Sequence, residues 1–250
     1  MRVFLGIDDT DVLGQRPGTG RLARELASEL EVNGFGCLVG VVRHQLLVDP
    51  RIPYTSHNSP ACVILDLNEG NNGSLAHLAE AAAAYVTHYA AVGSDPGICV
   101  AEAPRVAAAV QRFGYRASAE VVGKAEAYAL AAEGDIHLEE LGGTGAGIIG
   151  ALAAVGLTAD GNAGRLLEWA GGLRHLGEQV SVRLLRERGI NVLSISRNGE
   201  VVPLDAVIAT GDWLRPRWIG GRAVLLIEYT DQGWRCFDRK KQRADTVEEM

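Results

Sequence analysis

The stretch Arg2–Gly20, RVFLGIDDTDVLGQRPGTG, predicts a buried strand that ends in a cluster of carboxylates. The run Val3–Ile7 is short, apolar and rich in β-favouring residues, which is typical of a buried strand. Asp8, Asp9 and Asp11 follow at once. Carboxylates this close repel one another, and Mg²⁺ with phosphate oxygens is a common compensating partner. We therefore predict a magnesium and phosphate site at the end of this strand. The alternative is a solvated acidic turn.

Composition is that of an ordinary globular protein. The 250 residues suffice for one large or two small domains, and 47% of them are hydrophobic and 22% charged. The net charge of -7 disfavours attraction to nucleic acid through a global field. No apolar run reaches the roughly 18 residues of a membrane span, so we expect no membrane partner. The cysteines form no CxxC pair, which disfavours a zinc ribbon and predicts reduced thiols and a cytoplasmic setting; they are Cys37, Cys62, Cys99 and Cys236.

A helix is predicted directly after the acidic stretch. From Leu22, leucines recur at i, i+4 and i+8, and Asn33-Gly34 ends the pattern. We predict that Gly18 and Gly20 let backbone N–H groups at the helix start face an anion. Thr19 is then either the N-cap or a hydroxyl beside bound phosphate.

A second glycine-rich segment follows a predicted strand at 136–141. Residues 145–150 fit the pattern GxGxxG. The acidic residue that a dinucleotide site needs about 20 positions on would be Glu168, but we predict a helix over Arg165–Trp169. We therefore predict a general phosphate cradle, with a glycine-rich helix contact as the alternative; its candidate ligands are Gly143, Thr144, Gly145, Gly147 and Gly150.

Two further features are candidates for the same site. Lys124, on a helix predicted from Ser118, is the first lysine of a chain that otherwise uses arginine. It is either a cofactor ligand or a solvated surface residue. The strands 37–43 and 61–67 are joined by a long proline-containing loop, and such loops are usually functional or mobile. Its His57 and Asn58 are either substrate contacts or turn residues.

Four segments together resemble the archaeal tRNA-isoleucine 2-agmatinylcytidine synthetases. They are GIDDTD (6–11), RIPYTSHNSPA (51–61), SDPGICV (94–100) and GTGAGIIGALAAVG (143–156), in the same order along roughly residues 1–170. Members of that family use ATP and agmatine to modify a wobble cytidine of tRNA. The resemblance implies that Asp8, Asp9 and Asp11 hold Mg²⁺ and ATP phosphates, with the catalytic site completed by Thr19.

The resemblance also implies an α+β (α/β) fold. We expect a discontinuous kinase-like ATP-binding domain over 1–60 and 116–189, with a ferredoxin-like domain at 61–115, where predicted strands and helices alternate. Hairpin patterns at 191–202 and 224–237 predict a β-rich region over 190–238, followed by a polar tail at 239–250. The family's OB-fold and zinc ribbon have no counterpart in this sequence. We therefore expect no tRNA binding by this chain alone.

Three functions fit these patterns. The first is an ATP- and Mg²⁺-dependent phosphotransferase or ligase that acts on a small-molecule acceptor or with a separate RNA-binding subunit. The second is a phosphatase of the haloacid-dehalogenase type, with Asp9 as nucleophile in Asp9-Thr10-Asp11. The third is a non-catalytic, nucleotide-binding regulatory protein.

Overall fold

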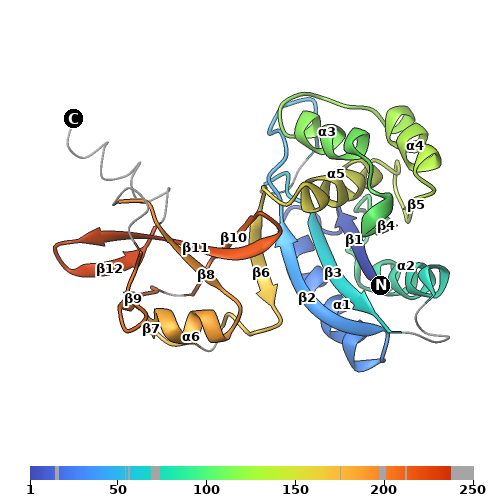
Figure 1. Ribbon diagram of the computed structural model, residues 1–250. Coiled ribbons are helices and arrows are strands. Elements are labelled where there is room, and N and C mark those ends of the chain that lie inside the picture. Colours follow the sequence, from blue (N-terminus) through green and yellow to red (C-terminus); the bar gives the residue numbers. More distant parts are fainter. Residues whose placement is uncertain are drawn as a thin grey trace. The chain divides into compact units, whose positions relative to one another are not determined.

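The computed structural model describes residues 1–14, 17–53, 55, 57–68, 74–174, 176–196, 201–211 and 213–237 (Figure 1). The chain forms two compact units. The first comprises Met1–Ala170 with Trp218–Gly221, and the second comprises Gly171–Arg217 with the chain from Arg222 onward. Strand β10 (Arg217–Ile219) crosses the boundary between them. The predicted polar tail at 239–250 lies outside the described residues.

The first unit begins with a ferredoxin-like βαββαβ arrangement. Its sheet order is β4-β1-β3-β2, and each neighbouring pair is antiparallel. The prediction of a separate ferredoxin-like domain at 61–115 is therefore wrong, because β3 and β4 flank β1 in one sheet. The elements are β1 (Arg2–Asp8), α1 (Thr19–Val32), β2 (Gly36–Arg43), β3 (Ala61–Leu67), α2 (Leu75–Tyr89) and β4 (Gly97–Glu102).

The rest of the first unit adds a strand at each side of this sheet. Strand β5 pairs with β4 and β6 with β2, both antiparallel. The helix predicted over 165–169 is wrong, because this segment is the strand that extends the sheet beside β2. The helix predicted from Ser118 begins at Lys124. The elements are η2 (Ala103–Arg105), α3 (Ala108–Ala117), α4 (Lys124–Glu133), β5 (His137–Glu140), α5 (Gly147–Asp160) and β6 (Arg165–Trp169).

Helices cover both faces of the β1 strand (Figure 1). Alternate β1 residues, among them Leu5 and Ile7, are buried in one cluster with apolar side chains of α1 and α2. On the other face Gly6 meets α5, where an added Cβ would lie 2.1 Å from the carbonyl oxygen of Ala151. Only a glycine allows the α5 backbone to approach the strand this closely. The end of β1 is therefore held rigidly between two helical layers.

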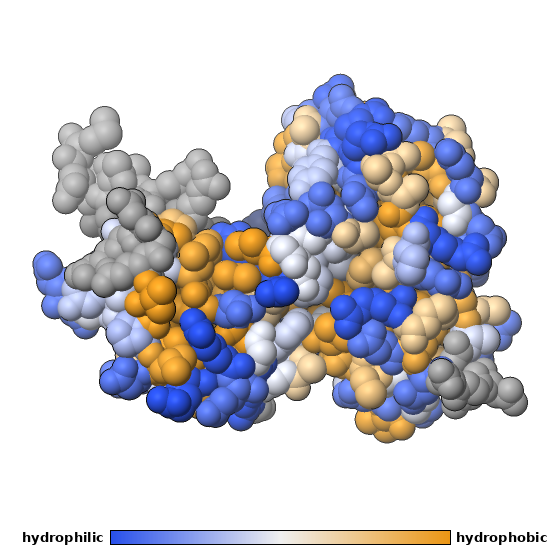
Figure 2. Space-filling model, viewed as in Figure 1, coloured by the Kyte–Doolittle hydropathy of each residue, from blue (hydrophilic) through white to orange (hydrophobic). Residues whose placement is uncertain are grey.

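The second unit contains β7 (Gln179–Ser181), α6 (Val182–Glu187), β8 (Asn191–Ser194), β9 (Val207–Ala209), β11 (Arg222–Thr230) and β12 (Gly233–Cys236). The predicted hairpin at 224–237 is confirmed, because β11 and β12 are antiparallel. The hairpin predicted at 191–202 is wrong, since β8 pairs in parallel with β11. Its turn, Asn198-Gly199, lies outside the described residues. This unit exposes several large hydrophobic side chains, and Figure 2 shows apolar surface over it.

No helix in the described part of the chain is long and apolar enough to cross a membrane.

Candidate functional site

The ends of neighbouring strands bring the candidate residues to one edge of the sheet. Because the ladder is antiparallel, β1, β2 and β5 end at the edge where β3, β4 and β6 begin. Asp8 is the last residue of β1 and lies opposite Gly97 at the start of β4. Gly97 in turn lies opposite Glu140 at the end of β5. The acidic strand end and the segment before the glycine-rich loop are therefore neighbours.

Asp8 lies against the first turn of α5. A Cβ added to Gly150 would lie 1.7 Å from Oδ2 of Asp8, so the carboxylate occupies the space that a side chain at position 150 would need. Burial raises the pKa of Asp8 to about 8; the Asp9 backbone hydrogen bond lowers it, and the charges of Asp9 and Asp11 raise it further. A carboxyl group whose pKa is raised in this way is a candidate for binding a cation.

Asp9 turns the chain away from the strand. Its φ of 54° lies in the left-handed region, which is uncommon for a residue other than glycine. Burial raises the pKa of Asp9 to about 6, and the charges of Asp95 and Asp11 contribute. The backbone N–H of Asp95 also donates to the Asp9 carbonyl oxygen at 3.2 Å. The carboxylates of Asp9 and Asp95 are therefore close enough to repel each other, beside Asp8.

The buried hydroxyl of Thr19 stabilises the acidic turn by hydrogen bonds. Both the hydroxyl and the backbone N–H of Thr10 donate to Oγ1 of Thr19, at 3.1 and 3.4 Å. Both threonines are buried. The N-cap of α1 is Gly18, so the prediction of Thr19 as the N-cap is wrong. The hydroxyl of Thr19 instead fixes the turn that carries Asp9 and Asp11.

Asp11 lies beside the start of α1. A Cβ on Gly18 would lie 3.0 Å from Oδ2 of Asp11, and the hydroxyl of Thr55 donates to Oδ1 at 3.3 Å. Burial raises the pKa of Asp11, while the Thr55 hydrogen bond and the Arg43 charge oppose the shift. The long loop thus reaches the site through Thr55. Of the two loop residues considered as substrate contacts, Asn58 donates to the Leu47 carbonyl oxygen at 2.8 Å, a contact within the same loop.

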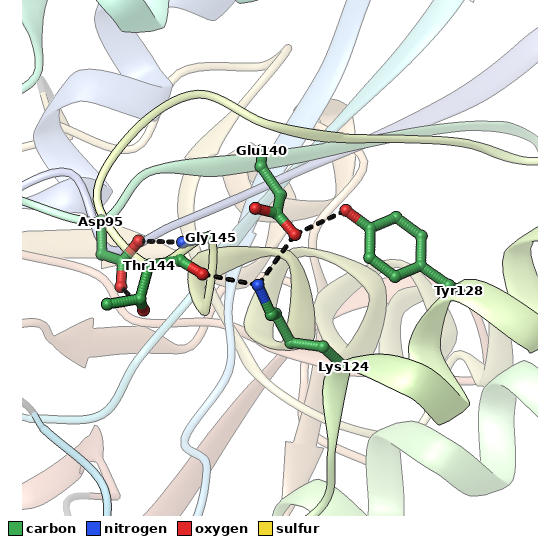
Figure 3. A network of polar contacts seen from close by, with 6 residues as sticks. All are labelled: Asp95, Lys124, Tyr128, Glu140, Thr144 and Gly145. Carbon is green, nitrogen blue, oxygen red and sulfur yellow. Dashed lines mark hydrogen bonds and ion pairs between the residues drawn. The ribbon is translucent and has the colours of Figure 1, made fainter.

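The glycine-rich loop is built around the carboxylate of Asp95 (Figure 3). The N–H of Gly145 donates to Oδ1 of Asp95 at 2.5 Å, and the Thr144 hydroxyl donates to Oδ2. Gly143 and Gly145 have φ values of 59° and 73°, which favour glycine. Asp95 was not among the predicted site residues, although it belongs to the SDPGICV segment and precedes a strand in an Asp-Pro-Gly turn.

Lys124 ties the loop to β5 and is not a free surface lysine (Figure 3). Its Nζ donates to Oε1 of Glu140 at 2.9 Å and to the Thr144 carbonyl oxygen at 2.5 Å. The hydroxyl of Tyr128 donates to the same Oε1 at 2.6 Å. Hydrogen bonds from Tyr128 and Lys124 lower the pKa of Glu140. The ammonium therefore positions the loop.

Two of the predicted glycine ligands lie in close packing contacts. A Cβ on Gly147 would lie 2.3 Å from the Asp95 carbonyl oxygen, and one on Gly20 would lie 2.8 Å from Cδ1 of Leu167. The packing alternative for the glycine-rich segment therefore explains the glycine at position 147, and a packing contact likewise explains Gly20. Gly150 and Gly18 differ, because a side chain at these two positions would collide with the carboxylates of Asp8 and Asp11.

The acidic residues do not by themselves form a cage for a metal ion. In the described ranges, no three His, Cys, Asp or Glu side chains converge as a metal-binding group. Mg²⁺ commonly takes only one or two carboxylates, completing its shell with phosphate oxygens and water. The raised pKa values of Asp8 and Asp9 fit that mode of binding. Joint binding of Mg²⁺ by Asp8, Asp9 and Asp11 therefore stays a prediction that needs the phosphates to complete the site.

Known structures of a tRNA-modifying synthetase share this fold. The protein is TiaS, an agmatidine synthetase for isoleucine tRNA: its apo structure matches with a TM-score of 0.51 at 23% identity. The complex of TiaS with its tRNA and ATP matches with a TM-score of 0.54, and the complex with tRNA, AMPCPP and agmatine with 0.51, both at 25% identity. Each match covers 62% of this chain but only 35% or 36% of TiaS. No protein-family model and no curated protein matches the sequence.

The resemblance to TiaS predicted from the sequence is confirmed, and so is the α+β class. The chain spans little more than a third of the length of TiaS.

Proposed function

We propose that this chain is an ATP-dependent ligase or phosphotransferase related to TiaS, with its nucleotide site at the end of β1. The observation that carries the proposal is the Asp8 carboxylate against Gly150, with a pKa raised to about 8 by burial. A second support is that a TiaS structure of the same fold contains ATP.

The triphosphate would lie beside Asp8 and Asp9, whose carboxylates would hold Mg²⁺. Magnesium neutralises charge on a transferred phosphoryl group. Asp8 and Asp9 are the proposed metal ligands, with Asp11 on the same acidic turn as a third candidate. The glycine-rich loop, held by Asp95 and Lys124, is proposed to border the phosphates; the N–H groups of Gly145 and Gly147 already donate to Oδ1 and to the carbonyl oxygen of Asp95.

The acceptor is proposed to be a small molecule or a group presented by a separate RNA-binding subunit. The net charge of -7 gives little sequence-independent attraction for RNA. TiaS itself is seen with tRNA, but most of its length lies outside the match. We therefore propose that tRNA binding needs more than this chain. We also propose that the protein acts in the cytoplasm, because its four cysteines are free thiols.

Calorimetry with Mg·ATP tests the proposal directly. We expect saturable binding that requires Mg²⁺ and is lost in Asp9→Asn, while circular dichroism of the variant stays unchanged. Glu133→Gln, an exposed change on α4, is the matched control. Unchanged affinity in Asp9→Asn would remove the acidic turn from the nucleotide site.

A gel-shift with total tRNA tests the acceptor half of the proposal. Sub-micromolar binding by the purified chain, or ATP turnover stimulated by tRNA, would show that this chain recognises tRNA without a partner.

A further inference from the structure

Two arginines lie opposite each other where the strands end at the candidate site. Arg43 is the last residue of β2, Arg165 is the first residue of β6, and they are direct partners in the antiparallel ladder. Directly opposed residues have Cβ atoms about 5 Å apart, and like charges in such a pair are destabilising. Both arginines are partly buried. This arrangement costs stability unless an anion is present.

No described carboxylate supplies that anion. In the described ranges, neither arginine side chain makes a hydrogen bond or an ion pair. Asp11 acts on Arg43 only through space, where it opposes the lowering of the Arg43 pKa by burial and by Arg165. Other arginines have close carboxylate partners: Arg2, Arg21, Arg51, Arg105, Arg116 and Arg235. The positive charges of Arg43 and Arg165 are therefore not balanced by a carboxylate in contact with them.

The start of α1 adds a third positive feature to the same place. Gly20 contacts Leu167, two residues after Arg165, which puts the first turn of α1 against β6. Its N-cap, Gly18, has no side chain to cap the helix, and the first turn contains no acidic residue. Free N–H groups at a helix start favour an anion. The arginines and the helix start thus face one space beside Asp11.

This space is separate from the glycine-rich loop. The strand order β4-β1-β3-β2-β6 puts β2 two strands and β6 three strands from β1. At about 4.8 Å per strand, the arginines lie roughly 10–14 Å from β1, on the side away from β4. Arg43 also shares the sheet face of Ile7 and α1, whereas Asp8 and Gly6 face α5.

We infer that Arg43, Arg165 and the first turn of α1 form a second oxyanion site, which binds a phosphate group of the acceptor substrate. The assignment of the ligand as an acceptor rests on the proposed function, but the oxyanion site stands on its own geometry. Paired guanidinium groups bind phosphate through two or more charge-assisted hydrogen bonds. Because this site lies beside Asp11 and apart from the proposed nucleotide site, it could hold the acceptor to which a group is transferred.

Calorimetry with inorganic phosphate, in the presence of saturating Mg·AMPCPP, tests this site. We expect wild-type protein to bind phosphate and Arg165→Gln to bind it roughly 10- to 100-fold more weakly, the loss of one charged hydrogen-bond donor. Mg·AMPCPP affinity should stay within about 3-fold of the wild type, a change below 1 kcal/mol. Arg112→Gln, an exposed change on α3, is the matched control. Weak phosphate binding by wild type, or parallel loss of nucleotide affinity, overturns the inference.

Thermal denaturation gives an independent measurement that does not need the nucleotide. Without phosphate, Arg165→Gln should melt above the wild type, because it removes the opposed charge. Phosphate should raise the melting temperature of the wild type but not of the variant. If the variant melts lower and phosphate shifts both proteins equally, the pair is structural. If Mg·AMPCPP fails to bind while phosphate binding still requires Arg165, the proposed function fails and the oxyanion site survives.

The source of the phosphate is distinguished by two further probes. Ribose 5-phosphate represents a small acceptor, and a short single-stranded RNA represents a polymer backbone. Competition with inorganic phosphate by only one of them identifies the class of acceptor. Competition by neither leaves a site for free phosphate and contradicts the acceptor assignment.

Discussion

Replacing Asp8 with asparagine should remove the largest pH-dependent contribution to the stability of the acidic turn. The folded-state pKa of Asp8 is raised to about 8 by burial, from an ordinary value of 3.8. Between these values the folded protein holds a proton that the unfolded chain has released. Stability linked to Asp8 is therefore complete at low pH and is lost as the pH rises toward the folded pKa. The loss is about 1.4 kcal/mol per pH unit.

The magnitude follows from the same two pKa values. Between about pH 5 and pH 8, the wild type should lose about 3–4 kcal/mol relative to Asp8→Asn, which has no proton to release. For a protein of this size that is roughly 10 °C in melting temperature. The Asp9 carboxyl, with a pKa raised to about 6, titrates in both proteins and largely cancels in the difference.

The assay is urea denaturation of both proteins across this pH range, with divalent ions removed. Millimolar Mg²⁺ should then narrow the gap at high pH, because it stabilises the ionised carboxylate only in the wild type. Glu133→Gln, which changes an exposed carboxyl on α4, should show no such trend. A difference between wild type and Asp8→Asn that is constant with pH would refute the argument.

Three further predictions address the loop and the core. Gly147→Ala should destabilise the protein by about 1–3 kcal/mol in denaturant, because the new Cβ would lie 2.3 Å from the Asp95 carbonyl oxygen; an unchanged midpoint would contradict the packing role. Lys124→Met should barely change the melting temperature but should weaken Mg·ATP binding in calorimetry, since Nζ holds the Thr144 carbonyl oxygen. Unaltered affinity would reduce Lys124 to a surface ion pair. Trp218→Phe should cost about 1 kcal/mol in urea by removing the buried bond from Nε1 to the Thr158 carbonyl oxygen at 2.9 Å; equal stability would indicate that water replaces it.

Local patterns in the sequence were sufficient to predict the strand that carries the acidic cluster and the glycine-rich loop. The apolar run before Asp8 predicts a buried strand, and the closely spaced glycines from Gly142 to Gly145 predict a loop. Both features are encoded within a few residues, so no knowledge of distant partners is needed. The hairpin at 224–237 is local in the same sense, because its strands are joined by a short turn.

Strand pairing was decided only by the tertiary structure. Alternation of strands and helices at 61–115 suggested a separate lobe, but β3 and β4 pair with β1, which lies more than 50 residues earlier. Residues 165–169 have a pattern compatible with a helix, and pairing with β2 makes them a strand. Propensity is a weak determinant where a segment gains a complete ladder of hydrogen bonds.

The same physics explains which site residues escaped the sequence. Asp95 lies in the SDPGICV segment, but neither it nor the Arg43–Arg165 pair has a local pattern that indicates its partners, which are set by the atoms that the fold places beside them. The raised pKa of Asp8 likewise depends on burial under α5, which lies far along the chain. Sequence alone determined which chemical groups the chain offers at a strand end and in a glycine loop. Tertiary structure decided which of them share a low-dielectric edge, because electrostatic interactions depend on distance in space and on exclusion of water.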